Sequence, residues 1–144
     1  MILAGNLQSY RRISMQTAPP GQLVLMLYDG ALRFLAAADQ GFDLEDPLDR
    51  NLAIHNNIRK VQDILRELVV TLNLEAGGEV AENLRDLYVY FGERLQESNL
   101  KKEREGLVEV VERLTVIRDA WSEMLGNLNH DQEGAVAAFA EAEG

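Results

Sequence analysis

Apolar side chains recur at intervals of three and four residues along most of the chain, the spacing that places them on one face of an α-helix. One such stripe consists of Ile54, Ile58, Val61, Leu65, Leu68 and Leu72. A second consists of Val80, Leu84, Leu87, Tyr88, Phe91 and Leu95. A third consists of Leu107, Val110, Val111, Leu114, Ile117, Trp121 and Met124. No window alternates as a half-buried strand does, so the pattern predicts an all-α protein.

Proline and a capping residue mark the first two helices. Pro20 suits a first helical turn, where its missing N–H is no loss, and the first helix should run from there to about Gln40. Asp46 is placed to cap a second helix that begins at Pro47 and ends at about Leu74. The short links favour antiparallel neighbours, and therefore an up-and-down four-helix bundle.

Glycines mark the predicted ends of the later helices. Gly77 and Gly78 should break the second helix, and Gly126 with Asn127 should end the fourth. The third and fourth helices are predicted over residues 80–98 and 105–125.

The chain is expected to consist of three parts. Residues 1–16 show no clear period and are interpreted as a flexible N-terminal arm. Residues 17–126 form the bundle, and residues 127–144 form either a short fifth helix or an acidic tail.

The first helix has more apolar surface than one core stripe requires. One face carries Leu23, Leu27, Phe34 and Ala38. The other carries Val24, Leu25, Tyr28, Leu32 and Leu35, while the polar residues share a narrow arc. Two interpretations remain open. The helix is either central and covered on both sides, or it leaves one face exposed as a groove for an apolar partner segment.

Composition excludes several classes of partner. Cysteine is absent, so there are no disulfides, thiol catalysts or cysteine-based zinc sites, which fits a cytoplasmic protein. The formal net charge is −10, which disfavours nucleic acid and anionic membrane surfaces as partners. No apolar run reaches the roughly 18 residues of a membrane helix, and the N-terminus is a poor signal peptide.

No catalytic, cofactor or metal site is predicted. A di-iron bundle needs Glu-x-x-His pairs, but Leu52 and Asn127 stand three residues before the two histidines, His55 and His130. Gly77 and Gly78 lack the lysine and hydroxyl residue of a phosphate-binding loop, and no Ser/His/Asp grouping is visible. The sequence therefore indicates a protein that is not an enzyme.

Two polar residues are candidates for partner contacts. Asn57 borders the apolar face of the second helix, where it either binds water or a loop, or offers its amide to the backbone of an extended ligand. Tyr10 either anchors the arm or contacts a partner. Spacing alone leaves both alternatives open.

Four stretches share a family pattern. Residues 17–34 read TAPPGQLVLMLYDGALRF and follow Tyr10, and residues 57–68 read NIRKVQDILREL. Residues 87–99 read LYVYFGERLQESN, and residues 118–121 read RDAW. In this order they resemble the signature segments of the bacterial flagellin-specific export chaperones, the FliS family.

The resemblance covers about residues 10–124, with a few departures. Pro19 replaces the usual Ser or Thr, which weakens a side-chain cap on the first helix. Val89 stands where Asp is common and Ser98 where Ala is common. None of these touches the apolar faces of the first two helices.

The resemblance implies a four-helix bundle that holds the disordered C-terminal segment of flagellin. Covering that segment would prevent premature polymerisation, and the complex would go to the export gate of the flagellar type III apparatus. It also implies that the N-terminal arm lies over the empty client site, with Ile2, Leu7 and Tyr10 as a displaceable lid. The protein would be a cytoplasmic monomer or weak dimer.

Client contacts are expected from the apolar stripes of the first two helices, with Asn57 as the polar contact and some stripe residues belonging to the core. The candidates are Tyr10, Leu23, Val24, Leu27, Tyr28, Ile54, Asn57, Ile58, Val61 and Leu65. The alternative function is a structural homodimer without a client, in which a second copy buries the spare face of the first helix.

Overall fold

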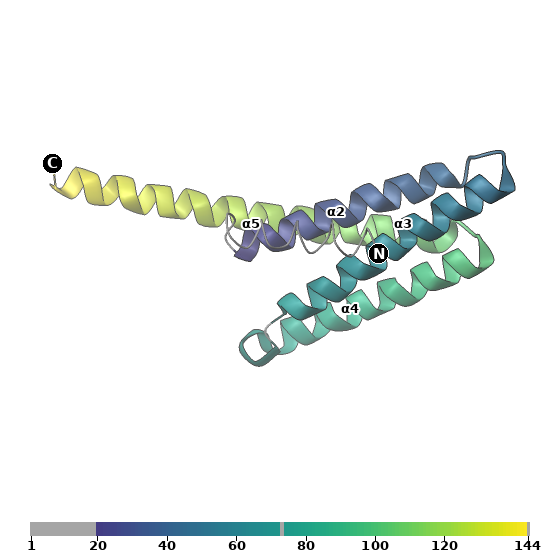
Figure 1. The fold of residues 1–144 in the computed structure, drawn as a ribbon. Coiled ribbons are helices and arrows are strands. Elements are labelled where there is room, and N and C mark those ends of the chain that lie inside the picture. Colours follow the sequence, from purple (N-terminus) through teal and green to yellow (C-terminus); the bar gives the residue numbers. More distant parts are fainter. Residues whose placement is uncertain (1–19, 73, 144) are drawn as a thin grey trace.

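The computed structural model describes residues 20–72 and 74–143, and the side chains within 21–72 and 77–128. It consists of four helices joined by short links (Figure 1). They are α2 (Pro20–Gly41), α3 (Pro47–Thr71), α4 (Leu74–Lys101) and α5 (Glu105–Glu143). The described residues contain no strand. The predicted all-α four-helix bundle is therefore confirmed.

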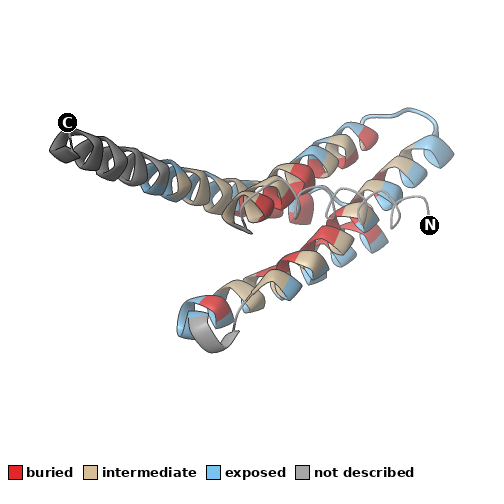
Figure 2. Ribbon diagram, turned by 60° about the vertical axis from the view of Figure 1, so that its left-hand side comes forward, coloured by how far each residue is buried: buried red, intermediate tan, exposed pale blue. Residues whose placement is uncertain are grey.

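Each helix packs against two others. α2 packs against α3 and α5, and α4 packs against the same two helices, so α2 and α4 lie diagonally across the bundle. The α2–α5 pair diverges from the α3–α4 pair toward the end where α3 gives way to α4 (Figures 1 and 2). α5 continues well beyond the other helices.

The start of α3 matches the prediction. Asp46 has extended dihedral angles, and its Oδ2 accepts a hydrogen bond of 2.9 Å from the backbone N–H of Asp49. Pro47 occupies the first turn, where a proline leaves no intrahelical donor unpaired. The carboxylate also lies at the positive end of the helix dipole.

The second helix does not reach the glycine pair. α3 already ends at Thr71, and Gly77 and Gly78 lie near the start of α4, which begins at Leu74. Gly78 has φ 56° and ψ −132°, non-helical dihedral angles that favour glycine, so the helix is interrupted there and its regular part begins close to the predicted start at Val80.

The predicted stop at Gly126 and Asn127 is wrong, because α5 continues to Glu143. A glycine ends a helix when it adopts positive φ, and among the described glycines only Gly78 does so. Gly126 keeps a helical conformation and costs about 1 kcal/mol relative to alanine. Leu125 lies against Gly21 near the start of α2, so α5 leaves the bundle just beyond this point.

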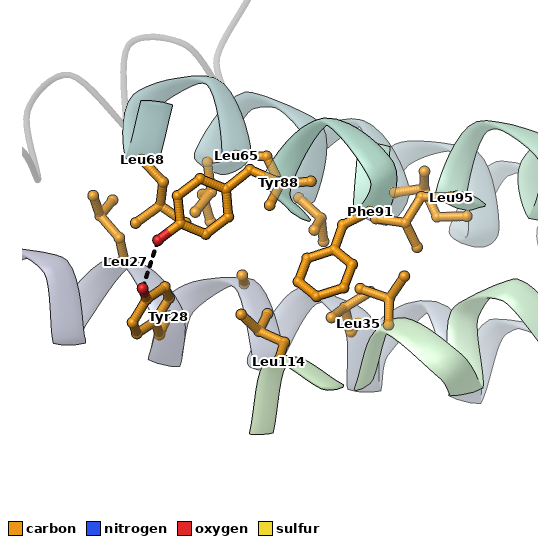
Figure 3. Close-up of a cluster of buried hydrophobic side chains, with 14 of the residues drawn as sticks. Leu27, Tyr28, Leu35, Leu65, Leu68, Tyr88, Phe91, Leu95 and Leu114 are labelled. Carbon is orange, nitrogen blue, oxygen red and sulfur yellow. Dashed lines mark hydrogen bonds between the residues drawn. The ribbon is translucent and has the colours of Figure 1, made fainter. Parts of the chain in front are cut away.

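The core is built from the predicted stripes. Its largest fully buried side chains are Tyr28, Phe91, Leu27, Leu35, Ile54, Ile58, Leu68, Leu95, Leu107, Leu114, Val61 and Val110. The hydroxyl groups of Tyr28 and Tyr88 meet between the diagonal helices α2 and α4, 2.5 Å apart (Figure 3). Such a pair fixes α2 against α4 where their backbones do not touch.

Two predicted stripe residues are exposed. Val80 is 68% exposed, since it follows the kink at Gly78 at the diverging end of the bundle. Met124 is 41% exposed, since it lies where α5 leaves the bundle.

Ion pairs set the register of α5. Arg118 Nε lies 2.7 Å from Asp29 Oδ1 on α2, and Arg94 Nε of α4 lies 3.1 Å from Glu109 Oε1. The Tyr90 hydroxyl also donates to Glu109. The hydrogen bond from Tyr90, followed by that from Arg94, lowers the pKa of Glu109. These groups are largely solvated, so they fix register more than they add stability.

Candidate functional site

An apolar cleft lies at the diverging end of the bundle. Its volume is about 370 Å³, and all four helices contribute to it. Its lining residues are Val24, Tyr28, Thr71, Leu72, Gly77, Val80, Ala81, Leu84, Tyr88 and Trp121. Along the regular part of α4 the cleft runs from Val80 to Tyr88, about 12 Å or two helical turns, and it continues past the kink to Gly77.

The glycine pair shapes one wall of this cleft. A Cβ atom on Gly77 would lie 2.6 Å from the Cβ of Ala81, so no larger residue fits there. Gly78 supplies the positive φ next to it, and a Cβ added there would meet nothing within 4 Å. Together the two glycines let the first turn of α4 bend, which leaves Val80 at the open rim of the cleft.

The polar side-chain atoms of the cleft are satisfied within the protein. Tyr28 and Tyr88 bond each other, and the Thr71 hydroxyl donates to the Leu68 carbonyl at 2.6 Å. Trp121 Nε1 donates to the Gly21 carbonyl at 2.9 Å. The cleft side chains therefore offer an occupant apolar contact rather than hydrogen bonds, and the occupant's own polar groups need internal partners.

The floor of the cleft is also uncharged. Burial raises the pKa of the Tyr28 phenol, although the hydrogen bond from Tyr88 partly opposes this. Burial and the hydrogen bond to Tyr28 both raise the pKa of Tyr88. The Trp121 ring packs edge-on against Tyr28, with ring centroids 6.4 Å apart and planes at 89°.

The structure separates the residues that the sequence grouped as client contacts. Six of them are buried in the hydrophobic core. These six are Leu23, Leu27, Ile54, Ile58, Val61 and Leu65. In this structure they do not present an open surface, apart from Leu65, which lines a groove between α3 and α4.

The remaining candidates fall in different places. Val24 and Tyr28 both line the cleft. Asn57 is half-buried on α3, and its Nδ2 donates to the Ala53 carbonyl one turn earlier at 2.8 Å. Its Oδ1 remains an acceptor on the surface. Tyr10 lies outside the described residues.

Both apolar faces of α2 have neighbours. Leu27, Tyr28, Ala31, Leu35 and Ala38 are buried, because α3 and α5 flank the helix. This arrangement matches the interpretation of a covered central helix for most of its length. The partly exposed remainder includes Val24, which opens into the cleft.

Part of the cleft is formed by residues that the sequence does not mark as a binding surface. Leu84 and Trp121 were assigned to core stripes, yet they line this hollow. A usable signal is present in the sequence, since the glycine pair Gly77 and Gly78 immediately precedes the second apolar stripe, which begins at Val80. Such a pair predicts an unusual backbone conformation, or a close approach of the backbone to neighbouring atoms, as readily as it predicts a helix end.

Two kinds of feature are absent from the described part of the chain. No group of three or more His, Asp or Glu side chains there is placed to hold a metal ion. None of the helices within that part is long and apolar enough to cross a membrane.

The family model and the individual relatives that match this chain all point to the same family. The model of the family described as flagellar protein FliS matches residues 3–137. The flagellar secretion chaperone FliS of Bacillus subtilis is 35% identical over 127 residues, covering 88% of this chain and 91% of that protein. The flagellar secretion chaperone FliS of Salmonella typhimurium is 31% identical over 128 residues, covering 86% of this chain and 93% of that protein.

A third relative agrees with these two. The flagellar secretion chaperone FliS of Campylobacter jejuni is 33% identical over 125 residues, covering 87% of this chain and 93% of that protein. The matches take in nearly the whole bundle, and FliS is a family of chaperones rather than enzymes. The expectation that this chain is not an enzyme agrees with that. The four-helix bundle with its apolar cleft thus belongs to the FliS family of flagellar secretion chaperones.

Proposed function

We propose that this protein is a cytoplasmic export chaperone for flagellin. It binds the disordered C-terminal segment of flagellin, prevents premature polymerisation, and brings its client to the export gate of the flagellar type III apparatus. Membership of the FliS family supports the export role. The observation that carries client binding is the open apolar cleft, whose polar side chains are already satisfied.

The cleft favours a helical stretch of the client. Its walls are helices, which have no free strand edge, and its side chains supply no unpaired donor or acceptor. A peptide that forms a helix satisfies its own backbone groups and can turn an apolar face into the cleft. Two helical turns would bring about three apolar side chains to it.

The energetics of such binding are moderate. Three buried apolar side chains contribute about 5–9 kcal/mol. Ordering a disordered segment costs about 2–5 kcal/mol or more. The difference suits a chaperone that must hold its client and later release it, and no ATP is needed for holding.

The predicted client contacts take different roles in this proposal. Val24 and Tyr28 contact the client in the cleft. The six core residues among the candidates hold the cleft walls in place. They contact the client only if the client separates α2 from α3. Asn57 acts as the polar contact through its free carbonyl oxygen.

The N-terminal arm, residues 1–16, is assigned the role of a lid. Ile2, Leu7 and Tyr10 are its apolar anchors, and the client displaces them on binding. These residues lie outside the described part of the chain, so the assignment rests on the family resemblance.

Calorimetric titration tests the proposal directly. The purified protein is titrated with a peptide comprising roughly the last 40 residues of flagellin from the same cell. A saturable one-to-one isotherm with a clearly negative heat-capacity change is expected, because apolar surface is buried. A flat trace with folded protein would remove flagellin as the client. Sedimentation should show a monomer or weak dimer, whereas a tight dimer would favour a structural homodimer module.

A further inference from the structure

A second hollow lies on the α3–α4 pair, and Tyr88 is the lining residue that it shares with the cleft. It is a groove of about 470 Å³ between these two antiparallel helices. Its lining residues are Arg59, Gln62, Leu65, Arg66, Val69, Tyr88, Val89, Gly92, Glu93 and Gln96. Neither α2 nor α5 contributes to it, whereas both contribute to the cleft.

The floor of this groove is apolar and partly open. Leu65 and Tyr88 are nearly buried beneath it, and Val89 is 51% exposed. Gly92 leaves the floor hollow, because a Cβ added there would meet no atom within 4 Å. Gln62 Nε2 and Gln96 Oε1 bond each other across it at 3.1 Å. The glutamine pair is exposed, so an occupant can displace it at little cost.

The two rims of the groove differ in charge. The α3 rim carries Arg59 and Arg66, and the α4 rim carries Glu93. Arg66 pairs with Asp63 one turn away, whereas among the described residues neither Arg59 nor Glu93 forms an ion pair. Arg59 is therefore a cation on the α3 rim that pairs with no described carboxylate, on a chain whose formal net charge is −10. Such a rim attracts acidic groups that the rest of the molecule repels.

The dimensions fit three turns of helix. Arg59 and Val69 mark the ends of the groove on α3, and ten residues of helix rise about 15 Å. Both walls are helices with internally paired backbones, so the groove has no strand edge to extend. An occupant must satisfy its own peptide groups while it turns an apolar face to Leu65, Val69 and Val89.

We propose that the α3–α4 groove is a second docking site, which takes an amphipathic helix of a partner protein. The apolar face of that helix covers the floor at Val89 and Gly92. Its acidic edge faces Arg59 and Arg66, and its basic edge faces Glu93. The charge asymmetry fixes the direction in which the helix lies, because reversing the helix would exchange its two edges. This site goes beyond the client cleft and does not depend on the identity of the client.

The test uses a synthetic helical peptide of about 18 residues, long enough to hold a helix of three turns in the groove. Leucines occupy one face, glutamates one edge and lysines the other. A peptide of the same composition with scrambled order is the control ligand. Calorimetry should give saturable one-to-one binding of the patterned peptide and much weaker binding of the scrambled one.

Substitutions in the groove then locate the peptide. A Cβ at Gly92 would meet no atom within 4 Å, so Gly92→Leu should be accommodated, fill the floor and weaken binding about tenfold or more. Asn83→Leu, an equally apolar change at an exposed α4 position outside both hollows, should leave binding unchanged. Arg59→Glu should weaken binding severalfold, and Arg59→Lys should largely preserve it.

Several outcomes would overturn the inference. Equal binding of the patterned and scrambled peptides would show that the groove does not recognise an amphipathic helix. Undiminished binding to Gly92→Leu would place the peptide elsewhere. If sedimentation shows a dimer that Gly92→Leu converts to monomer, the occupant is a second copy of this chain. The flagellin peptide should bind the Gly92→Leu variant normally. A wrong proposal for the groove can therefore be distinguished from a wrong proposal for the client cleft.

Discussion

The hydrogen bond between Tyr28 and Tyr88 predicts non-additive mutational effects. Both rings are buried, with exposed fractions of 0% and 2%, and their hydroxyl oxygens are 2.5 Å apart. Replacing one tyrosine by phenylalanine leaves the other hydroxyl buried without this partner. That costs about 1–3 kcal/mol of unfolding free energy. Replacing both leaves two apolar rings of nearly the same shape, which costs little more than one replacement.

Urea denaturation measures this coupling. Tyr28→Phe, Tyr88→Phe and the double variant are followed by far-ultraviolet circular dichroism and by fluorescence of Trp121, the single tryptophan. We expect each single variant to lose about 1–3 kcal/mol and the double variant to be more stable than the sum of its parts predicts. Tyr90→Phe is the control, because its loss of unfolding free energy should add to that of Tyr28→Phe. Additive losses for Tyr28 and Tyr88 would refute the coupling.

The same pair predicts loss of stability at alkaline pH. Burial raises the pKa of both phenols above their ordinary value of 10.0. A group whose pKa is higher in the folded state than in the unfolded state adds to the free energy of unfolding. That stabilisation is complete below the unfolded-state pKa and is lost as the pH rises from the unfolded-state pKa through the folded-state pKa. Stability should therefore fall as pH rises above about 10. In the double phenylalanine variant stability should fall less steeply, with the remaining slope coming from groups such as Tyr90 and Lys101, whose pKa values are also raised. An unchanged slope would contradict the reasoning.

Four further predictions concern the cap, the kink, the cleft and the arm. Asp46→Ala should cost about 0.5–2 kcal/mol in urea denaturation, and Asp46→Asn should cost much less. Gly78→Ala should cost about 1–3 kcal/mol by the same measurement, because its φ of 56° strains any residue with a Cβ. Val80→Asp should weaken flagellin-peptide binding about tenfold without changing stability. Val116→Asp on α5 is the matched control, since the two valines are 68% and 69% exposed. Deleting residues 1–16 should tighten client binding or raise apolar-dye binding, and weaker binding would count against the lid.

The helical elements follow directly from local signals. Side chains three and four residues apart share a helix face whatever surrounds them, so the stripes on α3, α4 and α5 could be recognised in advance. The cap at Asp46 depends only on the residues next to it. The helix ends at the glycines were less predictable. Gly78 adopts a positive φ within α4, whereas Gly126 stays helical in α5, and nothing in the adjacent residues separates these two behaviours.

The candidate site depended on packing, which periodicity does not determine. The stripe on α3 predicts that Ile54, Ile58 and Val61 share a face, but it does not say whether a neighbouring helix covers that face. In the structure α2 covers it, and the same contact buries Leu27. The open surface arises instead where α2 and α5 diverge from α3 and α4.

The surplus apolar surface of α2 has an explanation in this arrangement. A helix in a corner of a four-helix bundle needs apolar side chains toward two neighbours, and α2 has α3 on one side and α5 on the other. Tyr28 reaches between them to Tyr88 on the diagonal helix α4, and Trp121 of α5 closes against its ring. Val24 lies one turn earlier, where the helices diverge, and so opens into the cleft. A single two-faced helix can therefore be a core element along most of its length and a binding surface at one end.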